Sequence, residues 1–478
     1  MIDYSLLNDS QRAAVFDDSP KTVVIAGPGT GKTKTLAYKF AYLLESGYSN
    51  DEVMLVTFTN AAADEMSERI EKLIHVRPLY AGTFHSIFLR LIREYQDLLV
   101  DCSVLPQGFE NFNVLDEDNQ KIVFQSLVTK YGLNDSVTTL LMTLYSYLTN
   151  TMSAISLDAA RRYFRLNADK IAAVYNDIIN DYTKFKLSNK FFDFEDILVY
   201  MHSAVTKCSA FINKLTTRFR YILVDEFQDC SKLQLMIINT LFDKANGRLK
   251  IFAVGDDAQS IYGFRGADAS LIQEFASDAR KIVFNCNYRS GRVLAGSLGS
   301  FVPSSASYRM HLPMNKSINS DSVRLVTVNS ERSEIMVIHN ILKGLMSKGL
   351  QPKDIVILAR TNAKLEQLFN GLSGYNNDLM LIKTEEDFLN SLQMNKTKLM
   401  TIHRSKGLEW PAVIVAGIQD NVFPRLEGSS IEEERRLLYV AVTRAQQYCY
   451  LVAYTPIPGA FVDKLLQPAV IKGLDRMF

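Results

Sequence analysis

The stretch Ala26-Gly27-Pro28-Gly29-Thr30-Gly31-Lys32-Thr33 decides the fold of this chain. It follows the apolar run Thr22–Ile25 and opens a helical stretch that begins at Lys34. Backbone N–H groups of such a turn converge on a phosphate chain, the lysine supplies a cation for the β- and γ-phosphates, and the threonine hydroxyl can bind Mg²⁺. A strand before the turn and a helix after it favour a phosphate-binding loop over a Gly-rich turn without a ligand.

Two adjacent carboxylates follow a second apolar run. Asp225 and Glu226 come directly after Tyr221–Val224. Taken alone, two acids after a strand indicate a solvated loop. In a chain that also has a phosphate-binding loop, they predict that Asp225 holds Mg²⁺ and that Glu226 polarises the attacking water.

A third segment, Gly255–Ala267, follows the strand-like run Lys250–Val254. Gln259 can sense the γ-phosphate from the tip of this strand. Tyr262 and Phe264 are two aromatic residues in a Gly-flanked segment. If they are exposed, they form a stacking platform for bases, and if they are buried, they are core residues. Taken alone, the segment favours core residues.

Short buried strands alternate with helical stretches along most of the chain, which predicts an α/β fold of parallel sheets with helices on both faces. The predicted strands are Thr22–Ala26, Val53–Thr57, Tyr221–Val224, Lys250–Val254, Lys281–Phe284, Val323–Val328, Asp354–Ala359, Leu399–Ile402, Ala412–Ala416 and Cys449–Ala453. The predicted helices between them include Lys34–Glu45 and Ala61–Ile74.

The stretch from about Tyr95 to Asp193 has helical periodicity, as in Asn119–Tyr131 and Ala168–Phe185, and reads as a helical insertion. The segment Ser300–Asp321 is rich in Ser, Asn and Pro and reads as a loop or linker. The domains we expect are a first α/β domain (1–95 and 193–276), the insertion (96–192) and a second α/β domain (277–478).

Composition excludes several classes of protein. The chain has 478 residues, 47% of them hydrophobic and 22% charged, with a net charge of +1. These values exclude collagen-like, coiled-coil and wholly disordered chains, and neither exclude nor demand a nucleic-acid partner. Five scattered cysteines predict free thiols in a reducing compartment. We find no apolar run that could span a bilayer and expect a cytoplasmic protein without a membrane partner.

The chain resembles the superfamily 1A DNA helicases of the UvrD/Rep/PcrA type. Beyond the three segments above, the matching strings are Leu7–Gln11 (Q motif), Thr57–Asn60 with Ala61–Met66 (Ia), Gly82–His85 (Ib/Ic), Asn287–Ser290 (IV), Thr401–Trp410 (V) and Arg435–Gln446 (VI). They occur in the family's order over nearly the whole chain. The resemblance implies two RecA-like domains with the helical insertion called 1B.

The resemblance also implies roles at an ATP site. Gln11 would read adenine, Tyr288 would stack on it, and Glu409 would accept a bond from the ribose. Arg289 and Arg444 would act on the γ-phosphate, where charge develops in the transition state. The residues expected to bind ATP are Gln11, Ala26, Gly27, Pro28, Gly29, Thr30, Gly31, Lys32, Thr33, Lys34, Tyr288, Arg289, Glu409 and Arg444. The residues expected to act in catalysis are Lys32, Asp225, Glu226, Gln259, Arg289 and Arg444, with Thr33 and Asp225 on Mg²⁺.

For nucleic acid, the resemblance implies that a single DNA strand crosses the protein. Its expected contacts are Phe58, Asn60, His85, Tyr262, Phe264 and His403. The implied activity is ATP-dependent 3′→5′ translocation and unwinding of tailed or forked duplexes, with a replication, repair or nuclease protein as a possible partner.

The chain departs from the family's pattern at several positions. Lys34 replaces an arginine, Ala61 a lysine and Phe264 a tryptophan, while Arg404 and Trp410 are unusual in motif V. The stretch 361–397 is too short for the family's 2B subdomain, which we expect to be absent or vestigial. This gap keeps an alternative open, in which the chain is a DNA-stimulated ATPase that switches a partner, such as a nuclease in a defence complex, without unwinding by itself. A binding module with an inactive ATP site is disfavoured by the intact catalytic set.

Overall fold

The computed structural model describes residues 2–164, 167–303, 312–315, 318, 320–375, 378–425, 430–467 and 470–472. The chain folds into two compact units. The first comprises Met1–Ala26 and Lys32–Phe284, and the second comprises Gly27–Gly31 and Asn285–Phe478. From the sequence we had expected a division near residue 276. Among the described residues, no helix is both long enough and apolar enough to cross a bilayer.

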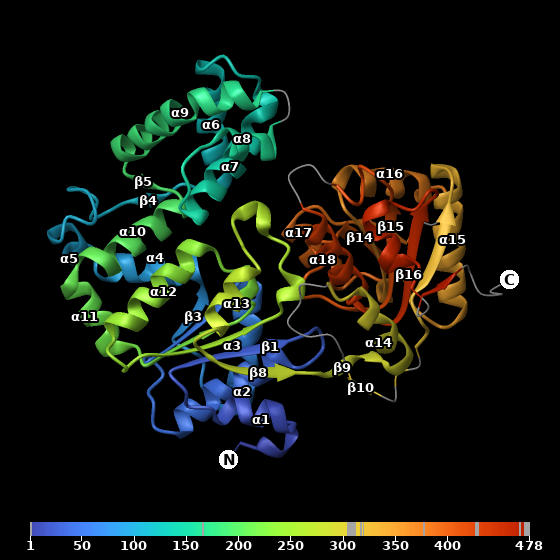
Figure 1. The fold of residues 1–478 in the computed structure, drawn as a ribbon, viewed down its shortest axis with the longest axis horizontal. Coiled ribbons are helices and arrows are strands. Elements are labelled where there is room, and N and C mark those ends of the chain that lie inside the picture. Colours follow the sequence, from blue (N-terminus) through green and yellow to red (C-terminus); the bar gives the residue numbers. More distant parts are fainter. Residues whose placement is uncertain are drawn as a thin grey trace. The chain divides into compact units, whose positions relative to one another are not determined.

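The first unit is built on a six-stranded parallel sheet in the order β3-β2-β6-β7-β1-β8. Its strands are β1 (Lys21–Ala26), β2 (Val53–Thr57), β3 (Tyr80–Thr83), β6 (Tyr221–Val224), β7 (Lys250–Gly255) and β8 (Arg280–Phe284). Its helices outside the insertion are α1 (Asp9–Phe16), α2 (Lys32–Glu45), α3 (Asn60–Ile74), α4 (Phe84–Glu94), α5 (Gln96–Asp101), α10 (Phe194–Lys207), α11 (Ser209–Arg218), α12 (Lys232–Lys244) and α13 (Ser270–Ala276). Figure 1 shows α1 and α2 on one side of β1 and β8, and α12 and α13 on the other. The expected parallel α/β fold is confirmed.

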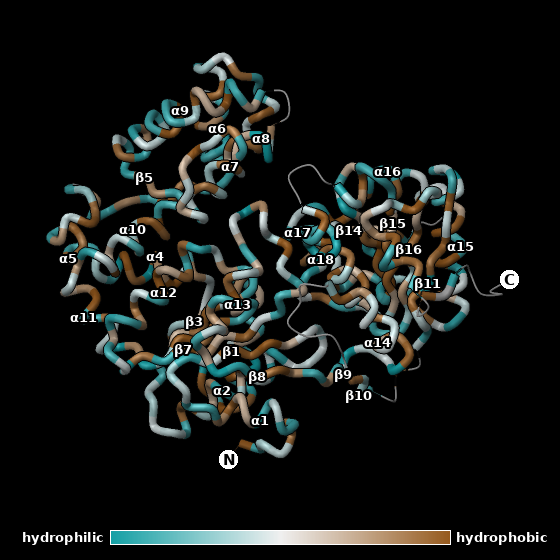
Figure 2. The backbone as a smooth tube through the Cα atoms, in the orientation of Figure 1, coloured by the Kyte–Doolittle hydropathy of each residue, from teal (hydrophilic) through white to brown (hydrophobic). Residues whose placement is uncertain are grey.

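Burial explains why these strands were visible in the sequence. All five residues of β2 and all four of β6 are buried, so each reads as an uninterrupted apolar run. Leu36 and Phe40 of α2 and Met66 of α3 close one face of this core. In Figure 2 the hydrophobic colour gathers on central strands such as β1 and β7.

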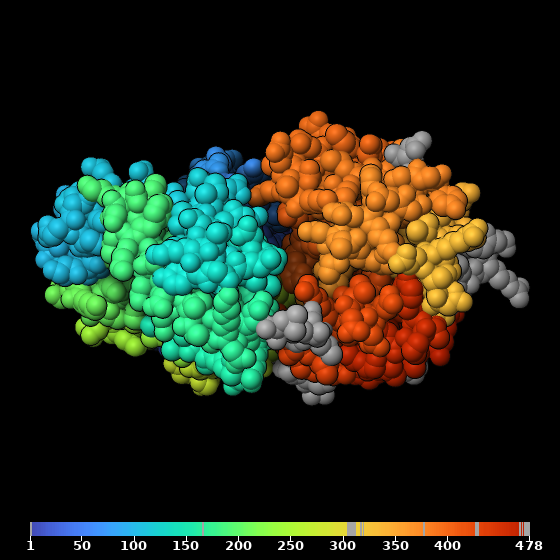
Figure 3. Space-filling model, turned by 90° about the horizontal axis from the view of Figure 1, so that it is seen from above, coloured from blue at the N-terminus to red at the C-terminus, as the bar shows by residue number. Residues whose placement is uncertain are grey.

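The helical insertion lies within the first unit. It contains α6 (Glu117–Lys130), α7 (Thr138–Thr151), α8 (Leu157–Tyr163) and α9 (Ala168–Asn189), which share a core of their own around Phe124, Leu144 and Tyr182. Its surface forms a block coloured cyan to green in Figure 3. The chain leaves through β4 (Asn113–Val114) and returns through β5 (Phe191–Phe192), and these two strands pair in parallel.

The expectation of free thiols was wrong for one pair of cysteines. Cys102 follows α5 and Cys208 precedes α11, and their sulfur atoms form a disulfide. The sequence separation of 106 residues hid this pairing, because no local pattern links two cysteines that flank a whole insertion. Cys230, Cys286 and Cys449 are free thiols.

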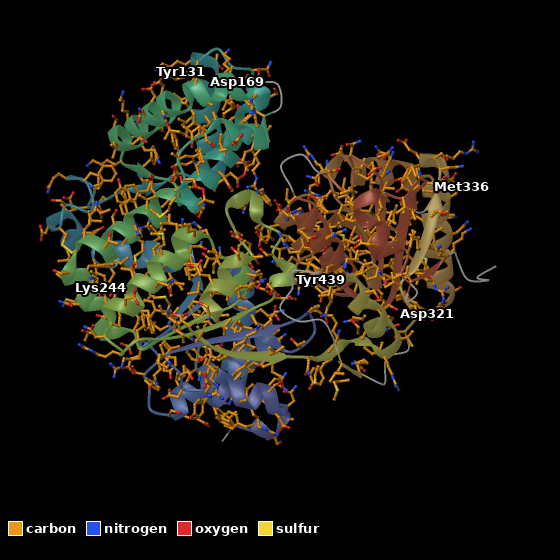
Figure 4. All side chains as sticks on the ribbon, viewed as in Figure 1. Tyr131, Asp169, Lys244, Asp321, Met336 and Tyr439 are labelled. Carbon is orange, nitrogen blue, oxygen red and sulfur yellow. A yellow bond between two sulfur atoms is a disulfide. The ribbon has the colours of Figure 1, made fainter. Side chains whose placement is uncertain are left out.

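The second unit contains a seven-stranded parallel sheet in the order β13-β14-β12-β15-β16-β11-β17. These strands are β11 (Arg324–Val328), β12 (Ile355–Ala359), β13 (Leu379–Leu381), β14 (Thr397–Thr401), β15 (Trp410–Ile418), β16 (Ala445–Tyr454) and β17 (Ile471–Lys472). The helices are α14 (Arg292–Leu298), α15 (Glu331–Ser347), α16 (Asn362–Ser373), α17 (Glu385–Ser391), α18 (Ile431–Val442) and α19 (Val462–Leu465). Figure 4 shows Tyr439 of α18 inside this unit and Met336 of α15 on its outer side, in keeping with their exposed fractions of 0% and 49%.

Two stretches of the second unit bear on the sequence analysis. The segment Ser300–Asp321, expected as a loop, includes strand β10 (Leu312–Asn315), which pairs with β9 (Cys286–Gly291). Residues 304–311, 316, 317 and 319 of that segment lie outside the described part. The stretch 361–397 holds α16, β13 and α17 among its described residues.

Candidate functional site

The phosphate-binding loop is shaped by two glycines with left-handed backbones. Gly29 has a φ of +71° and Gly31 a φ of +86°, which side chains other than glycine's rarely tolerate. A Cβ at position 29 would also lie 2.5 Å from the Cβ of Arg289. The carbonyl of Gly29 accepts a hydrogen bond from the backbone N–H of Tyr288 at 2.8 Å. The loop is therefore closely packed against the Asn287–Ser290 segment of the same unit.

Lys32 and Asp225 belong to neighbouring elements of the first unit. Lys32 is the first residue of α2, and its Nζ donates to the carbonyl of Ala26 at 3.1 Å. Asp225 follows β6 and is buried. Burial raises the pKa of this carboxyl, the neighbouring Glu226 raises it further, and the ammonium of Lys32 opposes both.

This environment fits a divalent cation. A buried carboxylate with a raised pKa is stabilised by a nearby positive charge, and Mg²⁺ prefers one or two carboxylates together with phosphate oxygens and water. Asp225 and the hydroxyl of Thr33 are the groups of this chain that would hold Mg²⁺ beside a triphosphate. The described residues contain no cluster of three or more His, Cys, Asp or Glu side chains suited to a metal.

Glu226 and Gln259 occupy the ends of adjacent strands β6 and β7. Glu226 has a left-handed backbone with φ +50°, and its N–H donates to the carboxylate of Asp225 at 2.9 Å. Gln259 is buried, and its Nε2 donates to the carboxylate of Asp256. Both residues lie at the carboxyl edge of the sheet, where ligands of parallel α/β folds bind.

Gln11 and Lys34, which are expected near the base, make hydrogen bonds to the segment Leu6–Asn8. Asn8 and Gln11 form a reciprocal capping box at the start of α1, in which the side chain of Gln11 accepts from the N–H of Asn8 at 3.1 Å. Lys34 donates to the carbonyl of Leu6 at 2.6 Å, and burial lowers the pKa of its ammonium. Lys34 thus hydrogen-bonds to the segment that precedes α1. This contact differs from the stacking on the base that is expected of the arginine usual at this position in the family.

In the second unit, Arg289, Glu409 and Arg444 lie close together. Arg289 donates through Nε to the carboxylate of Glu409, which also accepts from Nε2 of Gln446 at 2.9 Å. The guanidinium of Arg444 is buried and donates to the carbonyls of Val440 at 3.0 Å and Leu408 at 3.3 Å. Glu409, expected on the ribose, is bonded to an arginine in this structure. Tyr288, expected on the adenine, is 40% exposed.

A cavity of about 560 Å³ in the first unit brings together four of the predicted DNA contacts. They are Phe58, His85, Tyr262 and Phe264. The rings of Phe58 and Tyr262 stack with centroids 4.6 Å apart and planes at 25°. Tyr262 and Phe264 are therefore half-buried residues of a cavity wall, and base stacking by them stays a prediction.

The cavity has two walls of different chemistry. One wall, from the α/β core, carries the aromatic rings. The other comes from the insertion and presents polar side chains, namely Glu117, Gln120, Thr139, Thr143, Ser146 and Asn150. Arg265 is the basic side chain among the residues that line this cavity. A cavity with aromatic rings and few cations is better suited to bind the bases of a single strand, by stacking, than to bind its phosphates.

The two walls are joined by a buried ionic network. Lys186 of the insertion lies 2.7 Å from Asp193 and 2.7 Å from Asp196, at the start of α10. The hydroxyl of Tyr145 also donates to Asp193, at 3.0 Å. Burial and Asp193 raise the pKa of the Asp196 carboxyl. Because breaking a buried pair leaves an uncompensated charge, this network holds the insertion wall against the core.

Two predicted DNA contacts are not among the residues that line the cavity. Asn60 is the first residue of α3 and is exposed, close to Thr59, which does line the cavity. His403 belongs to the second unit and follows β14. For these two residues DNA binding stays a prediction.

Sequence comparison agrees with this arrangement. Residues 7–280 match the UvrD/REP helicase N-terminal domain, and residues 282–391 and 375–455 match the UvrD-like helicase C-terminal domain. The chain belongs to the UvrD/Rep helicase family. Membership assigns it to the ATP-hydrolysing DNA helicases and confirms the resemblance seen in the motifs.

Three curated relatives illustrate the range of lengths in the UvrD/Rep family. A probable DNA helicase of Mycoplasma pneumoniae is 29% identical over 94% of this chain and 83% of its own length. A probable DNA helicase II homolog of Mycoplasma capricolum is 32% identical over 75% of this chain and 49% of its own length. The ATP-dependent DNA helicase PcrA of Staphylococcus aureus is 29% identical over 76% of this chain and 49% of its own length. The matches to the latter two span about half of those proteins.

The motif comparison assigned no role to several residues that line the cavity of this UvrD/Rep family member, among them Phe194 and Arg265. Phe194 begins α10 and is 44% exposed, and its ring lies edge-on to His85 with centroids 5.8 Å apart. Arg265 directly follows Phe264. The usable signal for Phe194 was an aromatic residue in the first turn of a helix that begins with the acids Glu195 and Asp196.

Proposed function

We propose that this chain is an ATP- and Mg²⁺-dependent translocase that moves 3′→5′ along single-stranded DNA and couples hydrolysis to strand separation. The observation that carries the proposal is the segment Gly255–Ala267. One end of it holds Gln259 near the catalytic edge of the sheet, and the other end carries Tyr262 and Phe264 in the aromatic cavity. A change at the nucleotide can therefore reach the base-stacking residues through a few residues of chain.

In this proposal Lys32 binds the β- and γ-phosphates, Glu226 orients the attacking water, and Gln259 senses the γ-phosphate. Arg289 and Arg444 stabilise the charge that develops on the transferred phosphoryl group. Phe58, Tyr262 and Phe264 stack on successive bases, and each stacked base contributes about 1–3 kcal/mol whatever its sequence. We further propose a cytoplasmic protein that acts on tailed or forked duplexes.

The first test is ATP hydrolysis with and without poly-dT. We expect strong stimulation by the single strand, and a loss of at least about 100-fold in kcat for Lys32→Ala, because one preorganised contact to the developing charge is removed. Normal hydrolysis by Lys32→Ala would overturn the assignment of the site.

The second test separates Arg444 from the ATP-binding residues. Arg444→Ala should bind a fluorescent ATP analogue with unchanged affinity and lose about 10³-fold or more in kcat, as for other arginines that act on the transition state. Circular dichroism must accompany the assay, because the variant also removes the hydrogen bonds of Arg444 to the carbonyls of Val440 and Leu408. Weaker nucleotide binding in a folded variant would contradict this role.

Strand displacement on duplexes with a 3′ or a 5′ tail then tests polarity. Displacement from the 3′ tail alone supports the proposal. DNA-stimulated hydrolysis without displacement on either substrate would favour the alternative, a DNA-sensing ATPase that switches a partner. That alternative is kept because the matches to two of the three relatives above span only about half of those proteins.

A further inference from the structure

The side chain of Gln228 lies between the catalytic carboxylate and the segment that reaches the aromatic cavity. Gln228 follows β6 in the turn Phe227–Asp229 and is 1% exposed. Its Nε2 donates to the carboxylate of Glu226 and, at 3.4 Å, to Asp229. Its Oε1 accepts the backbone N–H of Asp256 at 2.7 Å. The amide orientation follows from these partners, because a carboxylate only accepts and a backbone N–H only donates.

The main chain of Gln228 is tied to the same segment at a second point. Its carbonyl accepts from the hydroxyl of Ser260 at 3.0 Å. Gly255 packs so closely that a Cβ there would lie 2.8 Å from Oε1 of Gln228 and 3.2 Å from its backbone nitrogen. The end of β7 is therefore packed tightly against the turn after β6.

The bonds continue from Asp256 toward the stacking residues. The carboxylate of Asp256 accepts from Nε2 of Gln259 and from the N–H of Ala258 at 3.1 Å. Gln259, Ser260 and Tyr262 are near neighbours in sequence. A path of polar contacts thus runs from the half-buried carboxylate of Glu226 through the buried side chain of Gln228 to the segment that holds Tyr262. Such contacts are stiff, because a broken bond in a dry environment is not replaced by water.

We propose that Gln228 is a positioning residue that couples the orientation of Glu226 to the state of the DNA-binding segment Gly255–Ala267. This inference rests on the proposed function and adds the element that would make hydrolysis depend on DNA. Through its N–H it aligns the carboxylate that orients the attacking water. Through its carbonyl oxygen it follows the backbone of Asp256 when Tyr262 and Phe264 engage bases.

Two variants of Gln228 test this link, one that removes all hydrogen bonds of the side chain and one that removes only its donor. Gln228→Leu removes all three hydrogen bonds of the side chain, to Glu226, Asp229 and Asp256. Gln228→Glu keeps an acceptor for Asp256 and replaces the donor to Glu226 by a carboxylate oxygen. Gln273→Leu is the matched control, because Gln273 is an exposed glutamine of α13 whose Nε2 lies 3.4 Å from Asp257.

The measurements are steady-state hydrolysis with and without poly-dT, the KM for ATP, and the Kd for a labelled oligo-dT. For both Gln228 variants we expect kcat with DNA to fall by at least about 10-fold, since small misplacements of reacting groups have effects of this size. The KM and the Kd should stay within about twofold of wild type, and the stimulation ratio should fall toward one. Gln273→Leu should match wild type in all four values.

Each contrary outcome has a definite meaning. Wild-type rates in Gln228→Glu would show that the donor to Glu226 is not used. An equal loss of basal and stimulated rates, with the ratio kept, would show that Gln228 supports Glu226 without coupling it to DNA. Either result overturns the inference. Thermal unfolding checks that Gln228→Leu is folded, and Gln228→Glu serves if it is not. Absence of hydrolysis in the wild type would instead overturn the proposed function.

Discussion

His85 lines the cavity formed with Phe58, Tyr262 and Phe264, and its imidazole is neutral there. Burial and, to a lesser degree, the nearby Arg265 lower its pKa from 6.5 to about 4, although Asp193 partly opposes them. Between these two values the unfolded chain holds a proton that the folded chain excludes. The stability contributed by neutral His85 is therefore present above pH 6.5 and is lost as the pH falls toward 4.

We expect the free energy of unfolding of the wild type to fall by about 2 kcal/mol more than that of His85→Gln between about pH 7 and pH 5. Urea denaturation of both proteins at the two pH values measures this difference. Parallel pH dependence in the two proteins would mean that His85 titrates normally in the folded state.

At the scale of single residues, motifs fix residue types at fixed spacings and so single out Lys32, Asp225 and Gln259 as candidates, whose catalytic roles stay predictions. The bonds of Lys34 to Leu6 and of Glu409 to Arg289 were not predicted, because each joins residues far apart in the chain. Gln228 was given no role by the sequence analysis, since its partner Asp256 follows another strand and is distant in the chain.

Among the elements, strands that are buried on both faces were easy to find. β6 and β12 are continuous apolar runs and were predicted within a residue of their bounds. β3 was missed because its sequence, Tyr-Ala-Gly-Thr, contains a glycine and an alanine and alternates in burial. β13 is only three residues long and partly exposed, so its pattern is too short to recognise.

The disulfide ties two elements that flank the insertion, and its contribution can be measured. In denaturant without reductant, thiol titration should find three free cysteines, and with reductant it should find all five. Cys102→Ser should lower the free energy of unfolding by about 2–4 kcal/mol in oxidising buffer, because the crosslink restricts the unfolded chain. Cys286→Ser, which leaves the bond intact, is the control. Five reactive thiols without reductant would show that the bond does not form.

For the whole molecule, a net charge of +1 and a cavity with Arg265 as its basic lining residue predict weak salt dependence. We expect the logarithm of the affinity for oligo-dT to fall against the logarithm of salt concentration with a slope no steeper than about −2. Fluorescence anisotropy between about 50 and 200 mM salt measures it. Arg265→Gln should make the slope shallower by roughly 0.7. A much steeper slope would show that phosphate contacts outside the cavity dominate.

The pairing of β4 with β5 has a consequence for how such a chain can change over generations. Asn113 lies beside Phe191 and Val114 beside Phe192, so the insertion leaves and rejoins its host at neighbouring strands about 5 Å apart. A gene could therefore lose, gain or exchange this module at a single locus, with a few residues bridging the break and no strand of the host sheet changing register. Such an exchange would leave Asp193 as a buried carboxylate without its counter-charge, because Lys186 belongs to the insertion. Any replacement module would have to bring a cation to the same place.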